Sequence, residues 1–249
     1  MNILVVNDDG YDSPGLRALV KALDQDHEVY VSVPDGQRSG KSQGITVGDL
    51  VYVEEREMEG ARDALVTTGT PADCTKIGLQ FLAERGTDID LVVSGINLGT
   101  NMGIDTLYSG TVGAATEAAI DRVHAIAVSV SGHHASHFDA PCALVRQVIP
   151  LALGLSPEIV VNLNFPDIPA EDLKGVLVTR LGRRNFIDRF VLQEGGGYRL
   201  CGHPQDFTGA DRAIDLGAVA QGYASVTPLL FDRTAEAVLP EVSGWGLTL

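Results

Sequence analysis

The sequence predicts an α/β fold in which a mostly parallel sheet carries helices on both faces, giving three layers. Short apolar runs typical of buried strands alternate with segments in which apolar residues recur at helical spacing. The chain opens with a strand, a helix and a second strand, and this order implies parallel strands joined by right-handed crossovers. Acidic and polar residues follow the strands directly, as expected for a functional edge of the sheet.

The predicted elements follow one another in regular alternation. The strands are short runs of apolar residues, many of them β-branched, at 3–6, 29–33, 64–66, 89–93, 125–130 and 159–163. The helices have apolar residues at helical spacing, over 16–23, from near Pro71, over about 112–120 and over about 140–153. Pro71 suits a first helical turn, and Ile77, Leu79 and Leu82 are expected to face inward. Gly154 stands where a glycine commonly ends a helix.

The pattern changes after about Thr179. Polar stretches, the glycines at 195–197 and short β-like pieces such as 223–226 replace the regular alternation. We therefore expect a single domain with a core at about 1–180 and an appended β-rich arm at about 181–249. Extended arms and hairpins of this kind often serve oligomerisation.

Composition limits the classes of function. With 249 residues, 45% apolar and 20% charged, the chain can fill one sizeable core. A net charge of −15 argues against binding to a nucleic-acid polymer, because no excess of Lys or Arg offsets phosphates. A small phosphorylated ligand would need a cation or backbone amides. The chain opens with neither a basic segment nor a long apolar run, so we expect no signal peptide, no membrane partner and a cytoplasmic location.

Neither the cysteines nor the histidines form a pattern typical of zinc. The three cysteines are far apart and are interpreted as structural: Cys74, Cys142 and Cys201. His133, His134 and His137 lie in a polar loop after a strand, with no nearby cluster of acids or thiols. A catalytic role for these histidines is therefore not favoured.

A metal site is predicted where three strands end. Asp8 and Asp9 follow the first strand, and the loops after the second and fourth strands contain Ser39 and Asn97. Two carboxylates, a hydroxyl and an amide oxygen suit Mg²⁺, Mn²⁺ or Ca²⁺ better than zinc. The alternative is structural: Asp-Asp-Gly as a turn and helix cap, Ser39 closing its loop, and Asn97 or Asn101 stabilising turns with positive φ. Arg38 and Lys41 could meet phosphate but are more simply solvated side chains.

Two polar turns that lead into helices are candidate phosphate sites. Ser109-Gly110-Thr111 precedes the helix at about 112, and either Ser109 or Thr111 can cap it. Free amides at a helix N-terminus bind phosphate well, since the helix dipole adds to their hydrogen bonds. Residues 68–73 enter another helix in the same way, although Pro71 removes one donor.

These segments together resemble the stationary-phase survival protein SurE family, over essentially the whole chain. The motifs occur in the order typical of that family: Asn7-Asp8-Asp9-Gly10, Ser39-Gly40, Gly69-Thr70-Pro71-Ala72-Asp73-Cys74, Ser94-Gly95-Ile96-Asn97-Leu98-Gly99-Thr100-Asn101, Tyr108-Ser109-Gly110-Thr111-Val112, Asn162-Leu163-Asn164-Phe165-Pro166 and Gly222-Tyr223-Ala224-Ser225-Val226-Thr227-Pro228-Leu229.

The resemblance implies a Rossmann-like core and a 5′-nucleotidase that releases phosphate from nucleoside monophosphates, with 3′-monophosphates and polyphosphate as further substrates. It implies one divalent cation per subunit, Mg²⁺ or Mn²⁺, and a homodimer or homotetramer that exchanges its C-terminal arm. Asp8, Asp9, Ser39 and Asn97 match the family's metal ligands. The family's substrate-facing loops correspond to Asn97, Asn101, Ser109, Gly110 and Thr111.

The family pattern is followed less closely between Leu181 and Asp215. Gly182-Arg183-Arg184 is similar to the family's Gly-x-Arg, whereas residues 207–215 match its Gly-Thr-Asp segment best through Asp215. The predicted metal ligands lie outside this stretch.

The chemistry of phosphate esters suggests a mechanism. A divalent cation neutralises charge on phosphate and lowers the pKa of a bound water, so that water can attack phosphorus in line, with Asp8 or Asp9 steering it. An aspartyl-phosphate route is the competing mechanism, but haloacid-dehalogenase sites have Asp-x-Asp where this chain has Asp-Asp. The competing functions are a non-catalytic nucleotide or metal sensor and a response-regulator receiver, whose phosphoacceptor Asp and later Lys are not convincingly placed here.

Overall fold

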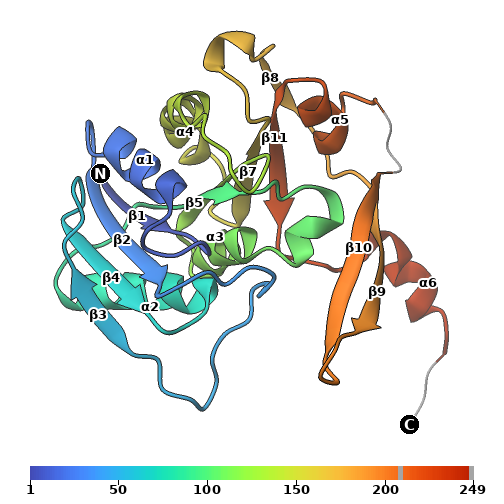
Figure 1. Ribbon diagram of the computed structural model, residues 1–249, viewed down its shortest axis with the longest axis horizontal. Coiled ribbons are helices and arrows are strands. Elements are labelled where there is room, and N and C mark those ends of the chain that lie inside the picture. The colour runs from blue at the N-terminus through green and yellow to red at the C-terminus, as the bar shows by residue number, and fades with distance from the viewer. Residues whose placement is uncertain (207–209, 247–249) are drawn as a thin grey trace.

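The computed structural model describes residues 1–206 and 210–246, and a nine-stranded sheet lies at its centre (Figure 1). The strands follow the order β3-β4-β2-β1-β5-β6-β7-β11-β8. In chain order they are β1 (Asn2–Val6), β2 (Glu28–Pro34), β3 (Val53–Arg56), β4 (Asp63–Thr67), β5 (Leu91–Leu98), β6 (His124–Val130), β7 (Ile159–Phe165), β8 (Val176–Val178) and β11 (Ala224–Leu230). Only two neighbouring pairs, β3 with β4 and β11 with β7, are antiparallel in this sheet of the described chain. The predicted α/β class with a mostly parallel sheet is confirmed.

Helices cover both faces of the sheet (Figure 1). Helices α1 (Pro14–Leu23) and α4 (Asp139–Ala152) pack on one face, and α2 (Pro71–Glu84) and α3 (Gly110–Ile120) pack on the other. Strand β1 alternates between the two cores, with Ile3 and Val5 facing α1 while Leu4 and Val6 face the other layer. Because both faces are buried, the strand is a continuous apolar run, as parallel central strands usually are. Within the described residues, no helix has the length and apolar character needed to span a membrane.

Strand β5 is longer than the apolar run predicts. The prediction ended at Val93, whereas β5 continues to Leu98 after a break in register between Ser94 and Asn97. Asn97 pairs with Ser129 and Leu98 with Val130 of β6. Asn97 is therefore the penultimate residue of a strand and does not lie in the following loop.

The inward face of α2 differs in part from the prediction. Leu82 is buried and half-buried Leu79 packs against the same core, whereas half-buried Ile77 belongs to none of the core clusters of the described chain. The helix instead approaches the sheet through Gly78, where an added Cβ would lie 2.9 Å from both Leu4 Cδ2 and Ser32 Cβ. Small residues at the contact bring α2 closer than the larger apolar side chains would allow.

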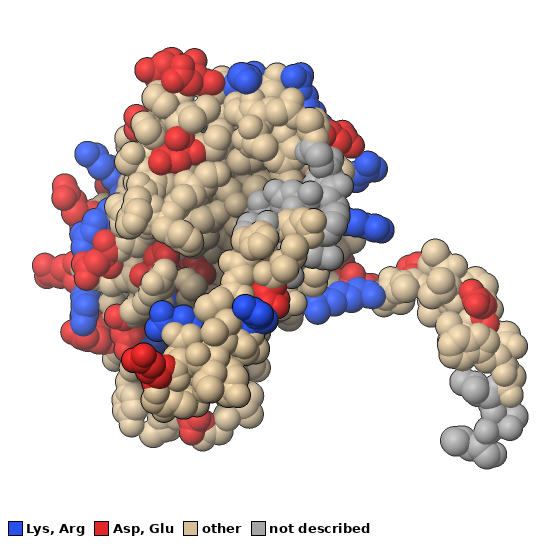
Figure 2. Space-filling model, turned by 45° about the vertical axis from the view of Figure 1, so that its right-hand side comes forward, with Lys and Arg blue, Asp and Glu red and all other residues tan. Residues whose placement is uncertain are grey.

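The last third of the chain contains the predicted hairpin, formed by β9 (Arg184–Leu192) and β10 (Tyr198–Asp206), which lies apart from the main sheet (Figure 1). Several of its apolar side chains are exposed, among them Phe190 and Tyr198. The segment with η3 (Glu236–Val238) and α6 (Leu239–Ser243) also stands away from the body (Figure 2). The use of this region in oligomerisation stays a prediction.

Part of the predicted arm belongs to the main sheet. The β-like piece expected at 223–226 is the start of β11, which lies between β7 and β8, and α5 (Asp215–Ala220) packs beside it. The boundary near residue 180 therefore does not separate the sheet from an appended arm. Of the segment 207–215 that followed the family pattern less closely, residues 207–209 lie outside the described chain. The remaining short helices are η1 (Gly103–Leu107) and η2 (Ala170–Asp172).

Candidate active site

Asp8 and Asp9 lie in a tight turn at the carboxyl end of β1. The Asn7 side chain fixes this turn, because its Nδ2 donates to the Gly10 carbonyl at 2.9 Å and its Oδ1 accepts from the Gly10 N–H at 3.1 Å. Gly10 has φ +94°, a conformation that L side chains rarely adopt. Helix α1 follows at once, capped by Ser13. The turn thus holds the two carboxylates at the edge where parallel strands end.

The N-terminus of α3 approaches Asp8 closely. Thr111 Oγ1 donates to Asp8 Oδ1 at 2.6 Å, and the carboxylate is 4% exposed. Gly110 makes this approach possible, since an added Cβ would lie 2.9 Å from Asp8 Cβ and 3.0 Å from Asp8 Oδ2. The helix end that was predicted to bind phosphate therefore contacts a protein carboxylate in this structure.

Burial raises the pKa of both carboxyl groups. For Asp8, hydrogen bonds from the hydroxyl and the backbone of Thr111 partly offset the pKa increase. For Asp9, burial and then the neighbouring charge of Asp8 raise the pKa from its usual value of 3.8 to about 6. A buried and a half-buried carboxylate side by side resist being ionised together, and a cation bound to both would offset this penalty.

Asp9 joins the end of β1 to the end of β5. Its Oδ2 accepts a hydrogen bond from the Leu98 N–H at 3.2 Å, so the residue next to Asn97 contacts the second carboxylate. Asn97 Nδ2 donates to the Gly99 carbonyl at 2.6 Å. This bond uses the nitrogen of the Asn97 amide, whereas a cation would bind the amide oxygen.

Ser39 lies at the edge of the site because the backbone of the preceding residue, Arg38, is bonded to Asp8. The Arg38 N–H donates to the Asp8 carbonyl at 2.7 Å, which brings the loop after β2 against the Asp8 turn. The Ser39 residue itself is exposed. The structure therefore places the loop after β2 at the site, but it shows no hydrogen bond between the Ser39 side chain and either carboxylate.

Polar groups of Ser109 and Asn101 form hydrogen bonds within the protein. Ser109 caps α3, and its Oγ accepts from the Val112 N–H at 3.0 Å. Asn101 Nδ2 donates to Ser129 Oγ at 2.8 Å, its N–H donates to Asn164 Oδ1 at 2.8 Å, and its carbonyl accepts from Asn162 and Asn164. Asn101 thus fixes the loop after β5 to strands β6 and β7. The other predicted turn, at Thr70, is a capping box in which Thr70 and Asp73 bond each other's N–H.

His133 lies nearer the site than the sequence indicated. An added Cβ at Gly99 would lie 3.8 Å from His133 Cε1, and the His133 imidazole slightly lowers the pKa of Asp9. The available signal was its position directly after β6, whose carboxyl end meets the same edge. His137 is different: its Nδ1 lies 2.8 Å from Asp167 Oδ1.

The donor set at this edge fits a hard cation. Asp8 and Asp9 offer carboxylate oxygens, and Asn97 and Ser39 lie on adjacent segments with an amide and a hydroxyl oxygen. Across residues 1–206 and 210–246, no three His, Cys, Asp or Glu side chains gather into a group that could hold a metal ion. A cation bound to the two acids would therefore complete its shell with neutral oxygen ligands, water or substrate.

Comparisons with known proteins agree with the resemblance in the sequence. Residues 3–188 match the family model described as Survival protein SurE. A protein of Heliobacterium modesticaldum described as 5′-nucleotidase SurE is 39% identical over 98% of this chain and 92% of its own. One of Clostridium beijerinckii with the same description is 38% identical over 98% of both chains. The crystal structure of the SurE protein from Aquifex aeolicus has a TM-score of 0.82 and 33% identity over 98% of both chains. The chain belongs to the SurE family.

Proposed function

We propose that this protein is a divalent-metal-dependent phosphatase that hydrolyses nucleoside 5′-monophosphates to nucleoside and phosphate. The observation that carries the proposal is the adjacent pair of carboxylates at the carboxyl end of β1, buried Asp8 and half-buried Asp9, beside the N-terminus of α3. The relatives described as 5′-nucleotidases support the substrate class. We extend the proposal to nucleoside 3′-monophosphates and polyphosphate as secondary substrates.

The proposed metal ligands are Asp8, Asp9, Ser39 and Asn97, with Mg²⁺ or Mn²⁺ as the cation. A bound cation of this type supplies Lewis-acid stabilisation of phosphate and a water of lowered pKa. Thr111 holds the Asp8 carboxylate in one orientation, and the Leu98 N–H does the same for Asp9. Asp8 and Asp9 would direct the attacking water in line with the ester bond. The oxygen–phosphorus bond to water would form while the bond to the nucleoside oxygen breaks, and the proton that the attacking water loses balances the one that the nucleoside oxygen gains.

Phosphate release from a panel of nucleoside 5′- and 3′-monophosphates tests the proposal. Each substrate is incubated with Mg²⁺, with Mn²⁺ and with excess chelator. We expect release from 5′-monophosphates with metal and none with chelator. If no substrate on the panel is hydrolysed while Mn²⁺ still binds, the protein is a nucleotide or metal sensor and the phosphatase proposal is wrong.

We expect metal binding to stabilise the protein strongly above pH 6 and weakly at pH 5. A cation binds the ionised carboxylate, and Asp9 takes up a proton below its pKa of about 6. Without metal, the folded state binds this proton more tightly than the unfolded state does. The free energy of unfolding therefore falls as the pH rises from about 4 to about 6. Thermal unfolding measured between pH 5 and pH 8, with Mn²⁺ or chelator, checks the prediction.

The variant Asp9→Asn is the control for this pH dependence, because its side chain does not titrate. We expect the residual stabilisation by Mn²⁺ to vary less with pH in this variant. Stabilisation of the natural protein that is equal at pH 5 and pH 8 would contradict the assignment of Asp9 as a ligand.

A further inference from the structure

The segment that carries Ser39 contains neither helix nor strand. It runs from residue 35 to residue 52, between β2 and β3, and we call it the Ser39 loop. Many of its side chains are exposed, including Val47 and Leu50. Since a metal ligand must be held within a fraction of an ångström of its working position, something other than secondary structure has to fix this loop.

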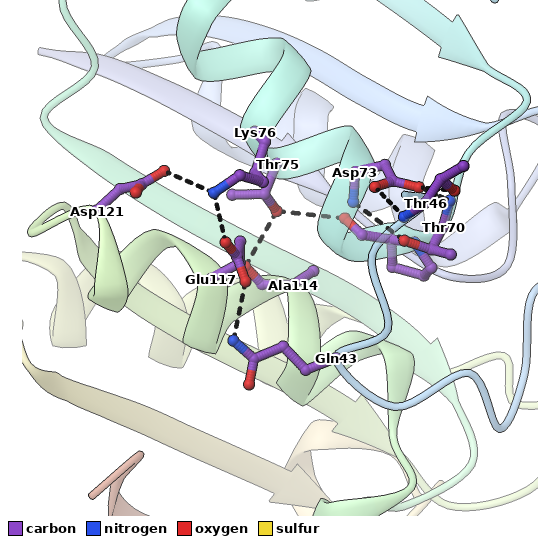
Figure 3. A network of polar contacts seen from close by, with 10 residues as sticks. Gln43, Thr46, Thr70, Asp73, Thr75, Lys76, Ala114, Glu117 and Asp121 are labelled. Carbon is purple, nitrogen blue, oxygen red and sulfur yellow. Dashed lines mark hydrogen bonds and ion pairs between the residues drawn. The ribbon is translucent and has the colours of Figure 1, made fainter. Parts of the chain in front are cut away.

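Glu117 of α3 supplies one anchor (Figure 3). Its side chain is 7% exposed, and it accepts hydrogen bonds from Gln43 Nε2 at 2.9 Å and from Lys76 Nζ at 2.7 Å. Bonds to an ionised acceptor are stronger than those between neutral groups. The Gln43 amide therefore fastens the middle of the Ser39 loop to the second turn of α3.

Asp73 of α2 supplies the second anchor (Figure 3). Its Oδ1 accepts from the Thr46 N–H at 2.9 Å and its Oδ2 accepts from Thr46 Oγ1 at 2.6 Å. The same carboxylate completes the capping box of α2 by accepting from the Thr70 N–H. The Asp73 side chain thus takes part in the N-terminal cap of α2 and also binds the Ser39 loop.

Close backbone contact between the loop and α3, next to the Gln43 anchor, leaves no space for a side chain at Gly113. An added Cβ at Gly113 would lie 2.5 Å from the Ser42 carbonyl oxygen. Ser42 also donates from its N–H to the Tyr108 carbonyl at 3.0 Å and from its Oγ to the Leu107 carbonyl at 2.6 Å. The loop is therefore seated on the first two turns of α3, the helix whose Thr111 orients Asp8.

We propose that Glu117 and Asp73 are positioning residues of the active site, which hold Ser39 at the metal site by binding Gln43 and Thr46. They act through the loop and touch neither substrate nor cation. Because α3 contacts both Asp8 and the Ser39 loop, one helix sets the distance between the two sides of the site. The role in catalysis rests on the proposed phosphatase function, whereas the seating of the loop does not.

The test uses the variant Gln43→Leu, which keeps the size of the side chain and removes the amide. Trypsin reports on the loop, since Arg38 and Lys41 are natural cleavage points within it. We expect about tenfold faster cleavage at these two points under conditions where the fold is intact, about tenfold weaker Mn²⁺ binding and a lower kcat, with a loss in the free energy of unfolding no larger than that of this one hydrogen bond. A tenfold change corresponds to about 1.4 kcal/mol, within the range for the net contribution of one intramolecular hydrogen bond.

The variant Gln80→Leu is the matched control. Gln80 Nε2 donates to Glu84 Oε1 at 2.8 Å on an exposed part of α2, so the same kind of bond is removed away from the loop. We expect wild-type cleavage, metal binding and turnover. A second loop variant, Gly113→Ala, suits the helix but displaces the Ser42 backbone, and should reproduce the faster cleavage and the weaker Mn²⁺ binding of Gln43→Leu.

Each result decides between the positioning role and its alternatives. Wild-type cleavage in Gln43→Leu would overturn the seating of the loop, and faster cleavage with unchanged Mn²⁺ affinity would overturn its role at the site. If the cleavage at Arg38 and Lys41 follows the urea dependence of global unfolding and not that of a local opening, Gln43 only stabilises the fold. If the natural protein releases no phosphate, the proposed function fails, while the cleavage comparison still decides whether Glu117 and Asp73 hold the loop.

Discussion

Replacing Asp8 by Asn is expected to lower phosphate release about 10³-fold or more while making the metal-free protein more stable. The loss follows from the proposed role, because a bound cation lowers the barrier by several kcal/mol and about 4 kcal/mol corresponds to 10³ in rate. Asn keeps the shape of the side chain and an oxygen that can accept from Thr111 Oγ1. It lacks the negative charge that the cation needs.

The gain in stability has a separate cause. Burial raises the pKa of Asp8, which means that the fold disfavours its ionised form. A neutral amide removes this penalty at pH 7, so the urea midpoint measured in chelator should rise. Opposite changes in activity and stability are typical of residues kept for function. They would also exclude misfolding as the reason for lost turnover.

Asp12→Asn is the control, because Asp12 follows the same turn but is exposed and pairs with Arg17 at 3.0 Å. We expect wild-type turnover and nearly unchanged stability, as exposed ion pairs contribute little. If Asp8→Asn keeps wild-type turnover with saturating Mn²⁺, the assignment of Asp8 as a ligand is wrong. Phosphate release and urea unfolding of the two variants give the answer.

The layers of the fold and the acidic turn could be predicted because both depend on local patterns. A continuous run such as Ile3–Val6 indicates a strand buried on both faces, and the residues after it must lie at the carboxyl edge. Asp8 and Asp9 were found by this reasoning alone. The direct bonds from Thr111 and from the backbone near Asn97 and Ser39 agree with the predicted convergence of these segments.

The remaining features depend on contacts between distant segments. β11 enters the sheet because its residues pair with β7, and no pattern within 224–230 distinguishes that position from an exposed hairpin. Asn101 resembles a substrate-facing residue in the sequence, but its partners come from β6 and β7, 28 or more positions away. The roles of Gly113 and Glu117 could not be predicted. The sequence does not show which backbone a glycine contacts or which side chains donate hydrogen bonds to a buried acid.

Asp215→Ala is expected to have the largest effect on stability, a loss of about 3–5 kcal/mol, as for a buried charged group whose partners are left unmatched. Asp215 is fully buried at the start of α5. Its Oδ2 accepts from the Gly103 N–H at 2.8 Å, and its Oδ1 accepts from the Gly182 and Leu216 N–H groups at 2.8 Å. One carboxylate therefore joins three segments, and alanine leaves three N–H donors without an acceptor, those of buried Gly103 and Leu216 and of half-buried Gly182.

The consequence of this loss reaches the active site, because Gly103 ends the loop that begins beside Asn97. We expect urea unfolding of Asp215→Ala to show the destabilisation, and Mn²⁺ to bind more weakly even where the protein is folded. Asp232→Ala is the control, since Asp232 accepts from the Thr234 N–H at 2.8 Å but is exposed, so water can replace the lost acceptor. A loss of less than about 1 kcal/mol in Asp215→Ala, similar to a surface change, would contradict the prediction. It would mean that the three segments are held by the core cluster around Met102 and Leu216, and not by the carboxylate.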